Sequence, residues 1–340
     1  MSNHSSTPSP ALFLNTVNAY QRTAAIRAAI ELQIFTTINK GIESVQSLAQ
    51  KCQTSERGMR ILCDYLVIIG FLAKEAQGYR LTPDTAMFLD RHSKAYMGDA
   101  IEFLLSPLIT NGFNDLAAAV RQGGTVVSSE GTLSPENPVW VKFAKAMSPM
   151  MAMPAQLIAQ MVNGDSTERI KVLDISASHG LFGIAFALHN PNAEIYAVDW
   201  APVLEVAKEN AQAQGVGDRY YTIPGSAFDV DYGSGYDLVL LPNFLHHFDM
   251  ETCEQLLRKI HRSLSVGGIT IVFEFIPNSD RLTPPSVAAF ALTMLATTPS
   301  GDAYTFAEYE RMFNNAGFSH CQLHSLPPTE QQVIIASQSR

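Results

Sequence analysis

The stretch that most constrains the fold of this chain runs from Lys171 to Gly183 and reads KVLDISASHGLFG. It opens with a short apolar run that ends at Ser176, and the apolar residues after Gly180 return at helical spacing. We therefore predict a buried strand, a tight turn of small residues and the start of a helix. Small residues let a ligand approach the backbone closely, and free N–H groups at the start of a helix favour an anionic group.

Two acidic residues are expected beside this turn. Asp174 lies where the first strand ends, and Asp199 ends the next predicted strand, which reads AEIYAVDW. Two carboxylates at adjacent strand tips would meet a ligand that carries an ammonium group and ribose hydroxyls. S-adenosylmethionine (SAM) carries both, together with a carboxylate that suits the start of a helix.

The same turn leaves two other interpretations open. Ser178, Gly180 and Gly183 follow the spacing of the dinucleotide motif G-x-G-x-x-G with its first glycine replaced. Small residues after a strand are also common in α/β proteins that bind no cofactor. Asp174 favours SAM over a nicotinamide cofactor, because a carboxylate at this place would repel a pyrophosphate.

Composition narrows the class of protein. The 340 residues, 46% of them hydrophobic, can bury a large core and are enough for two domains. The net charge of -9 argues against a general nucleic-acid or anionic-membrane surface. No apolar run reaches the roughly 18 residues that a membrane-spanning helix needs.

The remaining compositional signals concern location and thiols. Residues 1–11 are mostly polar and contain prolines, so we expect a disordered tail there and a soluble, cytoplasmic protein. The four cysteines lack C-x-x-C spacing. We therefore expect reduced thiols and no metal site.

Residues 12–110 are expected to form a winged helix. Apolar residues recur at helical spacing from Leu12 to Ile38, a longer helix capped by Thr54 ends at Gly70, and a small hairpin follows. The apolar helices favour a dimerisation platform, and hence a homodimer.

A winged helix could instead bind DNA. The candidate recognition helix carries Arg57 and Arg60 but also Glu56 and Asp64, and no basic run flanks it. Phosphate neutralisation would be poor, so neither nucleic acid nor a membrane is expected as a partner.

Residues 111–165 are expected to form connecting helices and one wall of a substrate pocket. A helical region from Ala86 to Val120 leads into a loop rich in Ser, Gly and Pro that ends at Pro138. The next segment carries one phenylalanine and several methionines, namely Phe143, Met147, Met150, Met151 and Met153. Methionines most often fill a core, but their polarizable thioethers can also grip a planar aromatic substrate.

From Ile170 onward, strands alternate with helices. This pattern predicts an α/β domain over residues 166–340 with a doubly wound, mostly parallel sheet, whose ligands bind beyond the carboxyl ends of the strands. Several candidate site residues fall at such ends: Asp174, Asp199, Gly225 to Phe228, Asn243 to His246 and Glu274.

The sequence resembles the two-domain, SAM-dependent small-molecule O-methyltransferases of plants and bacteria, both the plant caffeate type and the bacterial secondary-metabolite type. The stretch NFLHHFDMETCEQLLRKIHRSLSVGG is similar to the family stretch N-V-L-H-D-W-x-D-E-x-C before its G-G turn, and GSAF resembles G-D-M-F. The resemblance implies a winged-helix dimerisation domain followed by a Rossmann-like catalytic domain. It also implies that His246 is the catalytic base, Glu274 the acid that orients it, and Asp199 the ribose ligand.

The resemblance further implies two sets of binding residues. The set for SAM, and for its product S-adenosylhomocysteine, comprises Asp174, Ser176, Gly180, Asp199, Trp200, Ser226, Ala227, Phe228 and Asn243. The set for the acceptor substrate comprises Phe143, Met147, Met150, Met151, His247 and Met294.

The chain departs from the family pattern at four places. The family's D-x-G-G-G-T-G appears from Asp174 to Gly180 with three glycines lost, and Ser226 replaces an acid near the adenine end. His247 replaces the usual Asp after the base, and Ala303 stands where a second family glutamate is expected. Some relatives of this fold bind SAM without transferring methyl, as hydroxylases, decarboxylases or pericyclases, so a different reaction stays open.

The leading functional hypothesis is methyl transfer to a hydroxyl of a small aromatic or polyketide-like metabolite. The acceptor oxygen must lie about 3 Å behind the methyl group and be partly deprotonated, a task that suits a histidine of near-neutral pKa. Without the family pattern, His246 and His247 would simply cap the helix that begins near Met250. His179 is expected to cap the SAM loop or to form a local hydrogen bond. The alternatives are a SAM-binding enzyme with a non-methylating or a C- or N-methylating reaction and, last, a DNA-binding regulator. No residue names the acceptor.

Overall fold

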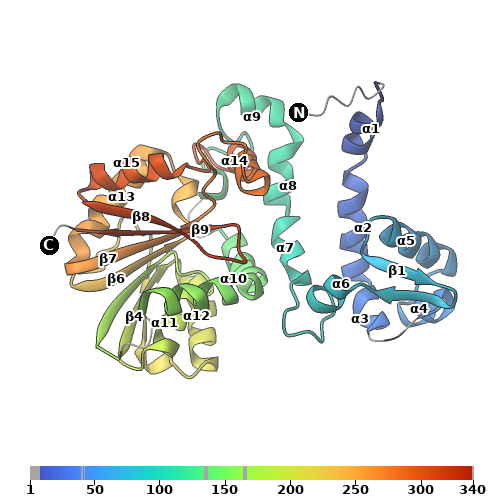
Figure 1. The fold of residues 1–340 in the computed structure, drawn as a ribbon, viewed down its shortest axis with the longest axis horizontal. Helices are drawn as coiled ribbons and strands as arrows, with labels where there is room; N and C mark the ends of the chain where they lie inside the picture. The colour runs from blue at the N-terminus through green and yellow to red at the C-terminus, as the bar shows by residue number, and fades with distance from the viewer. Residues whose placement is uncertain (1–7, 40, 42, 134–136, 164–166, 339–340) are drawn as a thin grey trace, which may run out of the picture. The chain divides into compact units, whose positions relative to one another are not determined.

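A computed structural model describes residues 8–39, 41, 43–133, 137–163 and 167–338, so most of the expected tail lies outside the described part (Figure 1). The chain divides into two compact units, Met1–Ile101 and Glu102–Arg340. This division precedes the domain boundary expected at residue 110, because α8 (Pro107–Asn114) already packs on α14 (Pro285–Thr297) of the second unit.

The first unit consists of short helices and one hairpin. Its elements are α1 (Ala11–Val17), α2 (Tyr20–Glu31), α3 (Ile34–Ile38), α4 (Val45–Lys51), α5 (Glu56–Ile68), β1 (Leu72–Glu75), β2 (Gly78–Leu81), α6 (Pro83–Phe88) and the 3₁₀ turn η1 (Gly98–Ala100). Helices followed by an antiparallel hairpin are the elements that a winged helix requires. Helix α1 begins at Ala11, the last residue of the predicted tail.

The predicted cap of α5 is wrong by one residue. The hydroxyl of Ser55, not Thr54, accepts the N–H of Gly58 at 3.1 Å, and Ser55 has the extended backbone of an N-cap. The core of this unit forms where α3, α4 and α5 meet the hairpin, around Phe35, Leu48 and the fully buried Tyr79.

The helical region predicted from Ala86 to Val120 begins in the first unit and continues into the second. It consists of the end of α6 and of three further helices, α7 (Ile101–Leu104), α8 (Pro107–Asn114) and α9 (Leu116–Gln122). Pro107 starts α8, since proline suits the first turn of a helix and cannot continue the preceding one. After the 3₁₀ turn η2 (Gly131–Leu133), the 25-residue helix α10 (Val139–Asn163) carries the predicted methionine segment.

The sheet of the second unit is doubly wound. Its strands are β3 (Ile170–Ile175), β4 (Ala193–Asp199), β5 (Tyr220–Pro224), β6 (Tyr236–Pro242), β7 (Leu264–Glu274), β8 (His320–Ser325) and β9 (Gln332–Ser337), in the order β5-β4-β3-β6-β7-β9-β8. All pairs are parallel except β7 with β9 and β8 with β9. The predicted class, a mostly parallel α/β sheet, is confirmed. The edge strand β8 escaped prediction because its half-exposed residues form no apolar run.

Helices cover both faces of the sheet (Figure 1). They are α11 (Leu181–His189), α12 (Ala201–Ala213), α13 (Met250–Ser263), α14 (Pro285–Thr297) and α15 (Phe306–Ala316), with the 3₁₀ turns η3 (Gly217–Arg219) and η4 (Leu245–His247). Helices α10, α11 and α12 share a core with one face, and α13 and α15 share a core with the other. The chain crosses from β5 back past β3 to β6, so the carboxyl ends of β3 and β6 flank the topological switch point where such folds bind ligands.

Within the described ranges, no helix is long and apolar enough to cross a bilayer. In the same part of the chain, no group of three or more His, Cys, Asp or Glu side chains is arranged to hold a metal ion. The cytoplasmic location expected from the sequence stays a prediction.

Candidate active site

The turn after β3 has the backbone that glycines would favour, although serines occupy two of its positions. Ser176, Ser178 and Gly180 all adopt left-handed conformations, with φ of 56°, 54° and 75°. A side chain is strained in this region, so the serines carry a modest conformational cost where the family has glycine. At Gly180 a Cβ would lie 2.6 Å from the hydroxyl of Tyr220, so glycine is required there for close packing as well.

The start of α11 differs from the expectation of free N–H groups. The N–H of Leu181 donates to Nδ1 of His179 at 3.2 Å, and the N–H of Gly183 donates to Oδ2 of Asp174 at 3.0 Å. The predicted local hydrogen bond of His179 is therefore confirmed. Burial lowers the pKa of His179 to about 4, so the ring is neutral and its Nδ1 can accept. The expectation of an open anion site at this helix start is wrong for these donors.

Asp174 is fully buried beneath the turn. Its Oδ2 takes the Gly183 N–H, whereas its Oδ1 has no hydrogen-bond partner. Burial is the main cause that raises its pKa to about 7, the charge of Asp199 adds to the rise, and the Gly183 N–H opposes it. The buried hydroxyl of Tyr220 also lacks a partner. Burial raises its pKa well above that of a free tyrosine, and the charges of Asp174 and Asp199 add to the rise. Orphaned polar atoms at this sheet edge fit a polar ligand with a cationic group. Contact between Asp174 and that ligand stays a prediction.

Asp199 joins two of the strand tips. Its Oδ2 accepts the N–H of Ser178 at 2.9 Å and its Oδ1 accepts the N–H of Trp200 at 2.7 Å. Its backbone carbonyl accepts the N–H of Gly225 at 2.9 Å, which adds the loop after β5. Burial raises the pKa of its carboxyl to about 6 against the effect of the two N–H donors. Each carboxylate oxygen keeps a further lone pair, so the group can still accept two ribose hydroxyls.

His246 and Glu274 form a buried pair at the ends of β6 and β7. Nδ1 of His246 lies 2.5 Å from Oε2 of Glu274, and the N–H of His246 donates to Oε1 at 3.3 Å. Glu274 is fully buried and His246 is 4% exposed. A carboxylate on Nδ1 favours the tautomer with its hydrogen there, which leaves Nε2 as a proton acceptor. The structure thus brings together the two residues that the sequence proposed as base and orienting acid.

The backbone of residues 301–303 supports His246 from the other side. The N–H of Asp302 donates to the carbonyl of His246 at 3.0 Å. Ala303, at the place of the missing family glutamate, is fully buried and brings no carboxylate. Asp302 does not replace it, because its own carboxylate pairs with Arg281 at 3.2 Å and accepts the N–H of Ala303.

Aromatic rings surround the imidazole pair. The ring of His246 lies 4.3 Å from that of His247 and 4.9 Å, edge to face, from that of Phe290. His247 in turn meets Trp140 at 5.5 Å, and Trp140 meets Phe143 at 5.6 Å. Burial and the neighbouring His246 lower the pKa of His247, so it is a neutral ring.

Of these rings, sequence reasoning singled out His246, His247 and Phe143 but not Trp140 or Phe290. Trp140 and Phe143 lie three residues apart, on one face of α10, which was the available signal. Phe290 lies inside an apolar helix, where nothing in the sequence separates a pocket residue from a core residue.

The other proposed binding residues fall into three groups. Met147, Met151 and Met294 are buried and Met150 is partly buried, and Met150 and Met151 pack in the main core, as the core-filling interpretation of the methionine segment expects. Asn243 follows β6 and Trp200 follows β4, the two strands that pair with β3. The Asn243 amide lies 3.7 Å from the sulfur of Met151, and Trp200 precedes α12. Ser226, Ala227 and Phe228 form the loop after β5.

Comparisons with known proteins agree with this geometry. Residues 113–319 match the family model of the O-methyltransferase domain, and residues 14–91 match the O-methyltransferase dimerisation domain. The tetracenomycin polyketide synthesis 8-O-methyl transferase TcmO of Streptomyces glaucescens is 26% identical over 94% of each chain.

Solved structures of methyltransferases share this fold. A crystal structure from Nostoc punctiforme, of a protein assigned provisionally as an O-methyltransferase, is 78% identical and superposes with a TM-score of 0.95 over 97% of this chain and 99% of that one. Human N-acetylserotonin methyltransferase in complex with SAM, 22% identical, shares the fold with a TM-score of 0.85 over the whole of both chains.

The sheet, the strand-tip site and the family matches define a SAM-dependent methyltransferase. The chain belongs to the O-methyltransferase family. The predicted family, fold class, enzyme class and cofactor are thereby confirmed, whereas the roles of individual residues stay predictions.

The raised pKa of Asp199 predicts pH-dependent SAM binding. The ionised carboxylate is the form that accepts two ribose hydroxyls, so a protonated Asp199 must release its proton on binding. We expect SAM affinity to be highest when both carboxylates are ionised, to begin to fall as the pH drops through about 7, where Asp174 takes up a proton, and to fall further through about 6, where Asp199 does. Calorimetry at pH 5.5 and 7.5, in two buffers of different ionisation enthalpy, would measure the affinity and the proton release.

Two variants control this experiment. Asp199→Ala should weaken SAM roughly tenfold to a hundredfold at pH 7.5, because charge-assisted hydrogen bonds of this kind are worth about 1.5 to 3 kcal/mol. Asp199→Asn should flatten the pH dependence near 6, leaving the part due to Asp174. Unchanged affinity in both variants would remove Asp199 from the cofactor site.

Gly301 is predicted to be essential for the position of the base. A Cβ at this residue would lie 2.3 Å from the carbonyl oxygen of His246, a backbone atom that cannot move alone. Gly301→Ala should therefore displace His246 and lower kcat by roughly a hundredfold, since ångström-scale misplacement has effects of this order. SAM affinity should change less than about twofold, because the strand tips that bind it are untouched.

Gly41→Ala is the matched control, because nothing lies within 4 Å of the added Cβ. Kinetics and calorimetry on both variants would check the prediction. Wild-type turnover in Gly301→Ala would show that the site tolerates the shift.

Proposed function

We propose that this protein moves the methyl group of SAM to a hydroxyl of a small aromatic or polyketide-like acceptor, with His246 as the general base. The observation that carries the proposal is the buried pair of His246 and Glu274 among aromatic rings at the carboxyl edge of the sheet. Some residues of this edge are proposed to bind the cofactor, and others to bind the acceptor and remove its proton.

When bound, SAM supplies an electrophilic methyl group on its sulfonium. Nε2 of His246 is free to take the proton of an acceptor hydroxyl, because Nδ1 is held by Glu274. The carboxylate keeps the ring in its orientation and stabilises the imidazolium that forms. The hydrogen bond from Asp302 fixes the backbone of the base. Proton removal and positioning are therefore the contributions of this chain to the reaction.

Two observations support an aromatic acceptor. Flat rings surround His246, and their faces favour an acceptor with a planar ring. These rings are those of Phe290, His247, Trp140 and Phe143. Among the relatives, TcmO is named for polyketide synthesis, and an enzyme of Streptomyces sahachiroi, 25% identical over 91% of this chain, is a naphthoate 3-O-methyltransferase.

The alternatives rest on narrower observations. A relative 26% identical over 86% of this chain is an L-tyrosine C(3)-methyltransferase, so carbon methylation has a precedent, and the fully buried Ala303 leaves a non-methylating reaction open. Mass spectrometry of products from labelled SAM, with a panel of phenols, separates these reactions.

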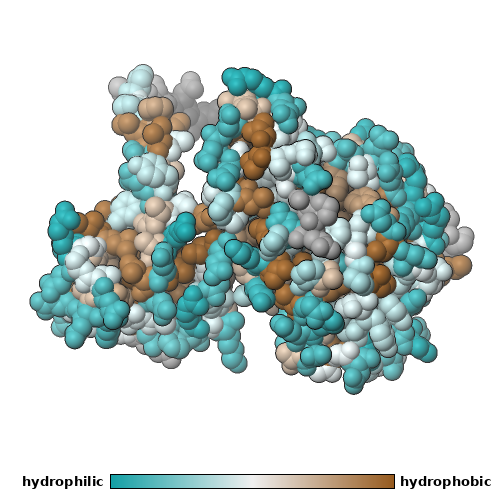
Figure 2. All heavy atoms as spheres, turned by 180° about the vertical axis from the view of Figure 1, so that it is seen from behind, coloured by the Kyte–Doolittle hydropathy of each residue, from teal (hydrophilic) through white to brown (hydrophobic). Residues whose placement is uncertain are grey.

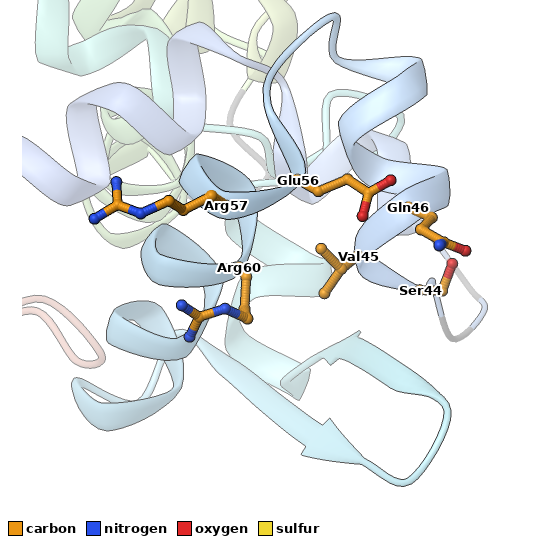
Figure 3. Close-up of a pocket in the computed structure, with 6 residues that line it drawn as sticks. All are labelled: Ser44, Val45, Gln46, Glu56, Arg57 and Arg60. Atoms are coloured by element: carbon orange, nitrogen blue, oxygen red, sulfur yellow. The ribbon is translucent and has the colours of Figure 1, made fainter.

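A DNA-binding role is disfavoured by the surface of the first unit. A hollow there is lined by Ser44, Val45, Gln46, Glu56, Arg57 and Arg60 (Figure 3). Glu56 shares this hollow with the arginines, and Arg60 pairs with Asp64 at 3.3 Å. Salt-dependent retention on DNA tests this role.

The prediction for the base is a large loss of turnover. His246→Ala should lower kcat about a hundredfold to ten-thousandfold, the usual effect of a positioned general base, with SAM affinity nearly intact. Glu274→Gln should cost less, since it keeps the shape and loses the charge that steadies the imidazolium. The loss should shrink at high pH or with more acidic phenols, because an ionised acceptor needs no base.

His247→Ala is the comparison variant and should matter least, because its neutral ring has no hydrogen-bonded carboxylate. Steady-state kinetics over pH 6 to 10 would measure all three variants. Full activity of His246→Ala at neutral pH would transfer the role to His247 or leave catalysis to proximity alone.

We also propose that the protein is a homodimer built on the first unit. Helix α1 buries none of its residues, and Leu12, Phe13 and Tyr20 are 81%, 67% and 66% exposed. Figure 2 shows hydrophobic residues on the surface of the first unit. An apolar surface of this kind marks an interface. The match of residues 14–91 to the family's dimerisation domain supports a second copy as the partner.

Sedimentation at micromolar concentration should therefore show twice the chain mass. Replacing Leu12 and Phe13 with Ser should shift the equilibrium towards monomer, because each side chain would lose about 1.5 to 3 kcal/mol of apolar burial in the dimer. The same substitutions at exposed Leu282 and Val266 of the second unit serve as the control. An active wild-type monomer would contradict the proposal.

A further inference from the structure

The loop that follows β5 is held by one lysine from another element. Nζ of Lys259, on α13, donates to the backbone carbonyls of Ala227 at 3.0 Å, Phe228 at 2.9 Å and Val230 at 2.6 Å. An ammonium has three protons, so this set uses all of its donors. The same ammonium lies 4.4 Å from the centre of the Tyr232 ring.

Hydrogen bonds within the loop also hold its backbone in one conformation. The N–H groups of Asp229 and Val230 donate to the carbonyl of Ser226 at 3.0 Å, and the Ser226 hydroxyl accepts the N–H of Phe228. Gly225 has a φ of 133° and starts the turn. Lys259 therefore fixes the position of an already ordered turn.

The position of this loop next to β4 indicates which part of the cofactor it would contact. The turn after β3 and the carboxylate of Asp199 at the end of β4 lie on neighbouring strands, and β5 is the next neighbour of β4. If the amino-acid end of SAM lies at the turn after β3 and its ribose on Asp199, its adenine extends towards the loop after β5. The N–H of Gly225 donates to the carbonyl of Asp199 and so keeps this loop against the residue proposed to bind the ribose.

From these contacts we infer that Lys259 is the positioning residue of the adenine loop, and that its contribution falls on the adenine part of SAM. This inference rests on the proposed cofactor site. Ser226 brings no carboxylate to the adenine, so recognition depends on where the loop backbone and Phe228 lie. Phe228 meets Phe248, which follows the base segment, at 5.0 Å.

Lys259 is not an ordinary surface lysine. It is partly buried, and burial lowers the pKa of its ammonium despite the charges of Asp229 and Asp231. A buried cation persists only where its donors are satisfied, here by carbonyl oxygens rather than by a carboxylate. Carbonyl oxygens carry only partial charge, so these contacts are not ion pairs. They suit a lysine that fixes the position of the loop backbone.

The test compares a ligand that has adenine with one that lacks it. Calorimetry would measure the Kd of S-adenosylhomocysteine and of S-ribosylhomocysteine for the wild type and for Lys259→Met, which keeps the length of the side chain and removes its donors. The affinity for S-adenosylhomocysteine should fall roughly tenfold or more, as expected for lost charge-assisted hydrogen bonds, and that for S-ribosylhomocysteine less than about twofold. Lys259→Arg should lie between the wild type and Lys259→Met.

Arg258→Met is the matched control on the same helix. Arg258 also binds a carbonyl, that of Asn315 at 3.3 Å, and pairs with Glu254, but has no bond to the loop. It should leave both affinities unchanged, and Lys259→Met should raise the KM of SAM while changing kcat less than about threefold. A parallel loss for both ligands, or an unchanged Kd for S-adenosylhomocysteine, would overturn the inference. A wild type that binds neither ligand would instead overturn the proposed cofactor site with it.

Discussion

The parallel hydrogen bonding of β3 to both of its neighbours fixes where every part of the site can lie. Val172 of β3 is in register with Ile195 of β4 on one side and with Leu238 of β6 on the other. The carboxyl ends of these strands therefore open on the same edge, with the cofactor turn, the carboxylate of Asp199 and the His246 segment side by side. The order of the strands separates the two proposed sets of residues: β3, β4 and β5 carry the proposed cofactor contacts, and β6 and β7 carry the proposed base and its acid.

Buried carboxylates give this edge its electrostatic character. Asp174, Asp199 and Glu274 each accept at least one backbone N–H, which partly offsets the cost of their burial. The first two still have raised pKa values, because burial disfavours their charged forms. A ligand with an ammonium group and hydroxyl donors would relieve this cost on binding. Glu274 has a partner within the protein, the imidazole of His246.

Three of the four departures from the family pattern fall where backbone groups hold the site in place. Ser176 and Ser178 keep left-handed conformations, so the turn retains its shape without glycine. The backbone of His246, the proposed base, is held by the N–H of Asp302 rather than by a side chain at Ala303, and the loop after β5 is bonded to Lys259 through its carbonyls. Side-chain identity can therefore change at such positions while the geometry of the edge stays fixed.

The sequence by itself determined most strands and helices of the second unit, the class of sheet, and the residues at the strand tips, because buried parallel strands and amphipathic helices leave strong local patterns. The half-exposed edge strand β8 leaves no such pattern. It also paired His246 with Glu274, through the family motif. The tertiary structure alone decided which partners those residues have. It placed hydrogen-bond acceptors from within the chain at the start of α11 and buried Asp174 fully. It also placed the rings of Trp140 and Phe290 near the two histidines and bonded Lys259 to the loop after β5. These contacts join residues far apart in the chain, and no local spacing encodes them.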